Sequence, residues 1–387
     1  MRIKKETIHN TIVWLALISQ AMTWVGLPLK INILISVAVA LTTFSMALAG
    51  VLLFFDRKGP AYRTNDLVLL AALVIIVVWC VMGTASINIE TVQRIILFFQ
   101  MPFLMLVARR ANKGGRVRDF VYTINACYPI LFLYYYNSDF VHRIKSEYGD
   151  GFVKAFTLGF ANPNETAMYL MVCAFLLLAA FFHYKTLYKR ILFGLDFLLI
   201  SFLIYKTECR IVILLMTLVL LGVVFGRKIK VGRRFIRCCF LASAGFTVIL
   251  LAAPAVGRIL IMNEVADTGR YQIFSRFFYN LTATSLMVGD FLKYPLNNMH
   301  NAFLGIFASF GIIVALYCWA FFCRGFSAIC GEKAESLEYS SLQLGCCAII
   351  LHSAVEAAMF LNGAIYADIV FLMLFMTASA DNTKVTK

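Results

Sequence analysis

The feature that most constrains the fold is a series of apolar runs along the whole chain, each about 17 to 25 residues long. A helix of this length crosses the roughly 30 Å hydrocarbon core of a membrane. Hydrophobic residues make up 61% of the sequence and charged residues only 14%, which excludes an ordinary soluble domain. Backbone groups in lipid must be hydrogen-bonded within their own segment, and no alternating barrel strands are seen. The sequence therefore predicts an all-α integral membrane protein.

We predict a single membrane domain over residues 1–387, built as one bundle of about twelve transmembrane helices. The first run follows three basic residues and lacks a small-residue cleavage site, which favours a retained anchor over a cleaved signal peptide. The predicted spans are 8–27, 31–55, 67–84, 91–108, 119–136, 164–182, 191–206, 210–226, 235–254, 301–322, 341–361 and 363–380.

The positions of the basic residues predict the orientation of this bundle. With the N-terminus in the cytoplasm, 24 of the 35 lysine and arginine residues fall in segments assigned to the inner side. Both termini are then inside, and a long extracytoplasmic loop at about 255–300 connects spans nine and ten. The net charge of +15 follows from this topology and from contact with the anionic lipid bilayer. It is therefore no evidence for binding nucleic acid.

Patterns for common cofactors are not found in the sequence. No Gly-rich phosphate loop ends in Lys-Ser or Lys-Thr, and no GxGxxG opens a helix after a strand. The eleven cysteines lie mostly in predicted spans and lack metal-ligand spacing, so we expect neither a disulfide framework nor a metal site. We expect no cofactor.

His300 and Asn301 stand at the outer mouth of span ten, where polar groups are costly without a purpose. His300 has two readings: an interfacial helix cap, or a catalytic base that faces a membrane-bound substrate. Asn301 is a candidate sugar ligand. Further along, His352 and Glu356 are four residues apart, so we expect them to share one face of span eleven. The two side chains either form a structural contact with each other or line an active cavity.

Arginines at the outer ends of spans are candidates for binding an anion. A guanidinium grips phosphate through planar, paired hydrogen bonds. Arg210 follows Glu208 where span seven turns into span eight, so interfacial anchoring or an ion pair explains it equally well. Several arginines around one cavity would suit a diphosphate. The candidates are Arg210, Arg270, Arg94 and Arg276.

The run Asn162-Pro163-Asn164-Glu165 opens span six. Asparagine before proline favours a turn, Asn164 is expected to cap the helix, and Glu165 suits the helix dipole. Capping is sufficient to explain this run. The alternative is that the Asn162 and Asn164 amides bind sugar hydroxyls.

Four motifs, taken in order, resemble the O-antigen polymerase and O-antigen ligase superfamily of bacterial envelope glycan assembly. They are Gly-Phe-Ala-Asn-Pro-Asn-Glu-Thr-Ala at 159–167, Thr-Glu-Cys-Arg at 207–210, Thr-Gly-Arg-Tyr-Gln-Ile-Phe at 268–274, and His-Asn-Ala-Phe-Leu at 300–304 followed by Phe-Gly-Ile-Ile at 310–313. The family commonly has Ser at the position of Cys209, and Gly-x-Gly where this chain has Val288-Gly289-Asp290.

The resemblance implies a glycosyltransferase that needs no metal and uses undecaprenyl-diphosphate-linked oligosaccharide. Arg210 and Arg270 match the family arginines, and His300 matches the family histidine. A polymerase of this kind lies in the bacterial cytoplasmic membrane, faces outward, and works beside flippase and chain-length regulator proteins. A ligase that moves the glycan to another acceptor is the first alternative. A secondary transporter or flippase for lipid-linked sugars is the second, although no internal repeat is seen.

Overall fold

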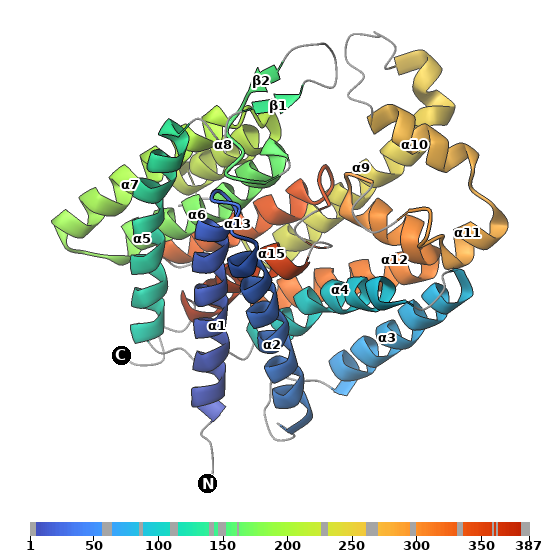
Figure 1. Ribbon diagram of the computed structural model, residues 1–387, viewed down its shortest axis with the longest axis horizontal. Helices are drawn as coiled ribbons and strands as arrows, with labels where there is room; N and C mark the ends of the chain where they lie inside the picture. Colours follow the sequence, from blue (N-terminus) through green and yellow to red (C-terminus); the bar gives the residue numbers. More distant parts are fainter. Residues whose placement is uncertain are drawn as a thin grey trace.

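The computed structural model describes residues 5–55, 64–84, 88–108, 115–138, 143–145, 152–160, 162–225, 231–260, 270–294, 299–330, 336–357, 360 and 363–380. Within these residues the fold is helical except for one short antiparallel hairpin (Figure 1). In that hairpin β1 (Arg143–Lys145) pairs with β2 (Phe152–Lys154), with Ile144 opposite Val153.

Every segment predicted as a span contains a helix. Their bounds are α1 Lys5–Gly26, α2 Asn32–Phe55, α3 Thr64–Thr84, α4 Ile89–Ala108, α5 Gly115–Asn137, α6 Pro163–His183, α7 Leu187–Lys206, α8 Arg210–Phe225, α9 Arg233–Leu260, α12 Ala302–Ile329, α13 Leu337–His352 and α15 Gly363–Ala380. Two shorter helices, α10 (Arg270–Tyr279) and α11 (Ala283–Val288), occupy the connection between α9 and α12. The all-helical prediction is therefore confirmed, with the hairpin as an addition.

Four helices among the described residues are long and apolar enough to cross a membrane, namely α2, α4, α6 and α12. Apolar stretches of α3, α8 and α15 are shorter. The fold is thus that of a helical membrane protein. The number of crossings and the orientation of the bundle stay predictions.

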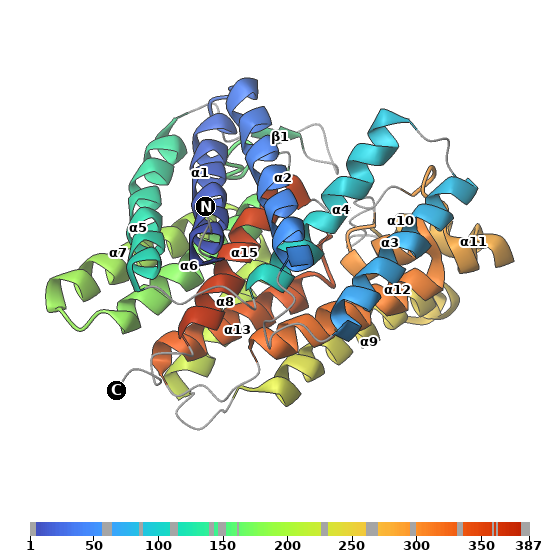
Figure 2. The same ribbon diagram turned by 90° about the horizontal axis from the view of Figure 1, so that it is seen from below.

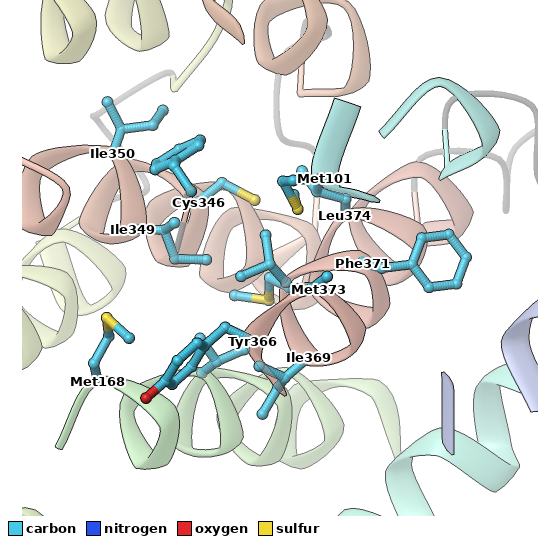
Figure 3. Close-up of a cluster of buried hydrophobic side chains, with 14 of the residues drawn as sticks. Met101, Met168, Cys346, Ile349, Ile350, Tyr366, Ile369, Phe371, Met373 and Leu374 are labelled. Carbon is cyan, nitrogen blue, oxygen red and sulfur yellow. The ribbon is translucent and has the colours of Figure 1, made fainter. Parts of the chain in front are cut away.

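The core of the bundle is formed by helices that are apolar on every side. In α6 each residue from Thr166 to Ala180 is buried, as is each residue from Tyr366 to Thr377 in α15. A helix that is hydrophobic all round belongs in a core, whereas α7 exposes apolar residues such as Leu195 and Leu198, as a lipid-facing helix does. Figure 3 shows side chains from α4, α6, α13 and α15 packed in this core, among them Met101, Met168, Ile349, Tyr366 and Met373.

The helix predicted for span ten is broken. At Gly311 the φ angle is 83° and the ψ angle 174°, so α12 consists of two segments joined at a kink. A side chain at Gly311 would overlap the Met287 carbonyl oxygen of α11, and one at Gly289 would overlap the backbone of Ser309. Glycine allows both the left-handed backbone and this close approach of α11 to α12.

Polar residues from three helices meet at one end of the bundle. His183, at the end of α6, lies 2.9 Å from the Glu338 carboxylate of α13 and 3.4 Å from the Asp119 carboxylate of α5. The buried Tyr122 hydroxyl also donates to Glu338, at 2.8 Å. The start of α5, the end of α6 and the start of α13 all fall on the predicted inner side, and the structure places these three ends together.

Candidate functional site

The site is built where the start of α12 meets the turn after α13. Asn301 is the N-cap of α12, and its side-chain oxygen accepts from the Leu304 N–H at 2.8 Å. Its Nδ2 donates to the Ala354 carbonyl at 2.6 Å and to the Thr247 hydroxyl of α9 at 2.9 Å. The Ala302 N–H donates to the Ser353 carbonyl at 2.8 Å. These bonds fix the two segments against each other.

His300 and Glu356 form the central pair of this site. His300 Nδ1 lies 3.0 Å from Glu356 Oε1. An ionised carboxylate can only accept, so Nδ1 carries the proton and the lone pair of the neutral ring is on Nε2. The His300 side chain is 32% exposed whereas that of Glu356 is 8% exposed. A buried carboxylate that orients a partly exposed imidazole is the arrangement of a general base.

The backbone holds His300 in an uncommon conformation. Its φ angle is 44°, in the left-handed region that few residues other than glycine adopt. Asn301, the next residue, is the helix cap, so His300 itself is not the cap of α12. The interpretation of His300 as the cap of this helix is therefore wrong. The strained turn is retained by the bonds of Asn301 and directs the ring toward Glu356.

A second carboxylate lies close to this pair. Glu165, in the first turn of α6, accepts a hydrogen bond from the Tyr366 hydroxyl of α15, and both residues are within electrostatic range of Glu356. Phe160 stacks on Tyr366 with ring centroids 5.7 Å apart. The site thus combines one imidazole, two carboxylates and a phenol from four separate segments.

A further acid is buried deeper in the bundle. Asp368 of α15 has no exposed surface, and it accepts bonds from the Tyr169 hydroxyl at 3.2 Å and the Ile369 N–H at 2.7 Å. An ionisable residue inside a membrane bundle is retained against a large desolvation cost. Tyr169 also packs edge-on against Tyr366, with ring centroids 5.9 Å apart, and so connects Asp368 to the polar site.

Arg210 lies at the same end of the bundle as the start of α6. It is the exposed first residue of α8. Phe156 donates its N–H to the Lys206 carbonyl at 3.0 Å, and the Thr166 hydroxyl donates to the Thr157 carbonyl. These two bonds tie the turn before Arg210 to the first turn of α6.

The loop arginines fall on α10. Arg270 begins this helix, and its side chain lies outside the described residues. Arg276 is exposed in the last turn. Its neighbour Phe277 packs edge-on against Phe307, with ring centroids 5.5 Å apart, so α10 lies over the first turns of α12.

Arg94 is half-buried in the second turn of α4. The described contacts do not join Arg210 or Arg276 to His300. The convergence of the four arginines on one diphosphate therefore stays a prediction.

Three sequence interpretations need correction. The helix α13 ends at His352, so His352 and Glu356 do not share a helix face; His352 is fully buried and Glu356 turns to His300. Asn301 is also fully buried, and its hydrogen bonds hold the backbone rather than a sugar. The cap of α6 is Asn162, whose side chain accepts from the Asn164 N–H at 2.9 Å, and not Asn164 itself.

Sequence reasoning missed two members of the site. Glu165 was explained by the helix dipole alone, and Tyr366 carried no motif. Their position in the sequence could have identified them, because Glu165 and Tyr366 each lie at the predicted outer end of a span. Among the described residues, no group of three or more His, Cys, Asp or Glu side chains is arranged to hold a metal ion.

No protein-family model matches the chain, and no curated protein matches it.

Proposed function

We propose that the protein is a polysaccharide repeat-unit polymerase. It transfers a glycan from an undecaprenyl-diphosphate carrier to another lipid-linked repeat unit, on the outer face of the bacterial cytoplasmic membrane. The observation that carries the proposal is the pair of His300 and Glu356, 3.0 Å apart at one end of a membrane bundle. The four motifs that resemble the O-antigen polymerase superfamily supply the substrate class.

The pair supplies the base that glycosyl transfer needs. The acceptor hydroxyl attacks the anomeric carbon of the donor sugar and forms the new glycosidic bond, and its proton passes to His300 Nε2. Glu356 keeps the ring in the correct tautomer and stabilises the imidazolium that forms. Base catalysis of this kind contributes about 100- to 10,000-fold to the rate.

The bond from the anomeric carbon to the diphosphate breaks in the same reaction, and the diphosphate leaves with the electron pair. Arginines neutralise the charge of the leaving diphosphate. Arg210 and Arg270 have this role, and Arg94 and Arg276 are weaker candidates for it. Orientation of both lipid-linked substrates within one cavity supplies much of the remaining rate advantage.

A ligase that transfers the finished glycan to a different acceptor would use the same base and the same arginines. The acceptor distinguishes the two reactions: a polymerase lengthens a glycan that remains on the lipid carrier. A polymerase also has natural partners in flippase and chain-length regulator proteins, which act on the same carrier.

Two features of the structure favour the transport alternative. Glu165, Glu356 and His300 are titratable groups within a bundle, and α12 is interrupted at Gly311. Carboxylate and histidine chains relay protons in transporters, and broken helices often hold their substrates. A proton-coupled flippase of lipid-linked sugars is therefore the second candidate.

Reconstitution of the purified protein in proteoliposomes separates the candidates. Lipid-linked repeat units are supplied on both leaflets, and the products are resolved by chain length. A polymerase produces a ladder of longer glycans in the absence of any proton gradient. Movement of unaltered repeat units between leaflets, without a ladder, would replace the proposal with the transport alternative.

A further inference from the structure

A groove lies between the beginning of α9 and the second segment of α12. Figure 2 shows these two helices running side by side. The groove encloses about 580 Å³ and is lined by Arg233, Arg237, Phe240 and Leu241 of α9 and by Trp319 and Arg324 of α12, among others. No part of the site described above lines it.

Three guanidinium groups meet in this groove. Arg233 and Arg237 are four residues apart, so they project from the same face of α9, and Arg324 faces them from α12. All three residues are exposed, and none of the described residues that line the groove is acidic. The three guanidinium groups give the groove a positive potential, which attracts an anion.

The rest of the groove is apolar. Phe240 is fully buried and packs against Phe326 with ring centroids 5.8 Å apart, which makes a rigid wall. Leu241 is 61% exposed, so the groove is open on the side of the bundle where its apolar residues face outward. Trp319 packs on Phe303 and closes the other wall. A ligand with an anionic head and an apolar chain matches both parts of the groove.

The arginine end of the groove lies away from the His300 site, whereas Phe240 and Trp319 reach Phe303, three residues after His300. Asn301 contacts Thr247, fourteen positions after Arg233 on the same helix, which is about 21 Å along the axis. That separation places the groove toward the opposite end of α9. The basic run at 227–234 enters α9 at this end, where the sequence predicts the cytoplasmic surface. Anionic lipids are concentrated there.

We infer that this groove is a binding site for an anionic glycerophospholipid of the cytoplasmic leaflet. Arg233, Arg237 and Arg324 bind the headgroup phosphate, and Phe240, Leu241 and Trp319 line the first part of an acyl chain. The inference is independent of the proposed glycosyl transfer, since it uses none of the same residues. An anion without a chain would leave the apolar wall unfilled, which favours a lipid over a soluble phosphate.

Fluorescence quenching tests the inference on the full-length protein in nanodiscs. The discs contain phosphatidylcholine with a small fraction of phosphatidylglycerol that has brominated acyl chains. Bound brominated lipid quenches Trp319, and the Trp319→Phe variant, which retains every arginine, identifies this contribution among the four tryptophans. The same fraction of brominated phosphatidylcholine measures random contact with lipid.

The triple variant R233Q/R237Q/R324Q removes the headgroup contacts. A matched control, K185Q/K189Q/R190Q, removes three charges from Lys185 before α7 and from the first turn of α7. We expect the apparent affinity for phosphatidylglycerol to fall at least about tenfold in the triple variant and to stay near wild type in the control. We also expect excess quenching by phosphatidylglycerol over phosphatidylcholine to disappear in Trp319→Phe.

Each remaining outcome overturns the inference. Equal quenching by the two lipids, or equal loss in the triple variant and in its control, would show that the groove does not select an anionic lipid. Displacement of the brominated lipid by inorganic phosphate, at an ionic strength matched with chloride, would assign the groove to a soluble anion.

Discussion

His300 Nδ1 lies 3.0 Å from Glu356 Oε1, although 56 positions separate the two residues in the sequence. One residue precedes α12 and the other follows α13, and the bonds of Asn301 hold these segments together. The pair therefore depends on the packing of two helix ends and not on any local motif. One nitrogen of the imidazole is engaged by Glu356, and the His300 side chain is 32% exposed.

The first prediction concerns this pair. His300→Ala is expected to lower the rate of glycan lengthening about 100- to 10,000-fold, because the acceptor hydroxyl loses its base. Glu356→Gln is expected to reduce the rate less, because the amide oxygen still orients the ring but no longer stabilises the imidazolium. The measurement is polymer length in a deletion strain that carries each variant at matched membrane levels. Wild-type chain lengths from His300→Ala would reject the catalytic role.

The second prediction concerns the binding of the diphosphate. Arg210→Lys keeps the charge but loses the paired donors, so activity is expected to fall sharply in protein of normal abundance. Arg270→Lys is expected to behave in the same way. The control is Arg190→Lys, since Arg190 stacks on Phe181 with 4.8 Å to the ring centroid, away from the predicted outer end. Near-normal polymer from both test variants would remove these arginines from the site.

The third prediction concerns Asn301 as a structural residue. Asn301→Ala removes the helix cap and leaves the Ala354 carbonyl without its donor, which is expected to cost about 3 kcal/mol of stability. Asn301→Asp restores the acceptor for Leu304 but not the donors, so its loss should be smaller. Thermal unfolding in detergent measures both. Asn164→Ala is the matched control, and an equal loss there would contradict the assignment.

The fourth prediction concerns the kink in α12. Gly311→Ala is expected to destabilise the protein by more than about 2 kcal/mol, because its φ angle of 83° disfavours a side chain and the new Cβ would overlap α11. The control is Gly245→Ala in α9, where a Cβ meets nothing within 4 Å and the change is expected to be neutral or stabilising. The difference between their unfolding midpoints tests the kink, and equal midpoints would reject it.

The fifth prediction concerns topology. Reporter fusions after Gly115, Lys230 and Asp290 are expected to report internal, internal and external positions, because basic residues concentrate in the first two segments. An external signal from either of the first two, or an internal signal from the third, would show that the orientation is wrong.

Much of the fold follows from local sequence, because long apolar runs leave the backbone no alternative to a helix in lipid. A helix lies at every predicted span, and α6 begins close to its predicted start, although Asn162 caps it in place of Asn164. The residues at which helices end were less predictable. The apolar run at 341–361 continues past His352, but α13 ends there because Ser353 to Ala357 turn to meet α12.

The site was predictable only in part. Position and residue type were enough to single out His300 as a polar residue at a span mouth. The partner was not predictable, because the spacing of His352 and Glu356 suggested a shared helix face that the end of α13 abolishes. Glu165 and Tyr366 belong to helices far apart in the sequence, and only the packing of α6 against α15 brings them together.

The sequence by itself determined that this chain is a helical membrane protein, because hydrophobicity and length act within each segment. The tertiary structure decided which polar groups meet. Hydrogen bonds of Asn301 and the kink at Gly311 join segments that hydrophobic patterning treats as independent. The pairing of His300 with Glu356 arises where Asn301 joins the start of α12 to the turn after α13, since directional bonds between distant residues have no counterpart in a local pattern.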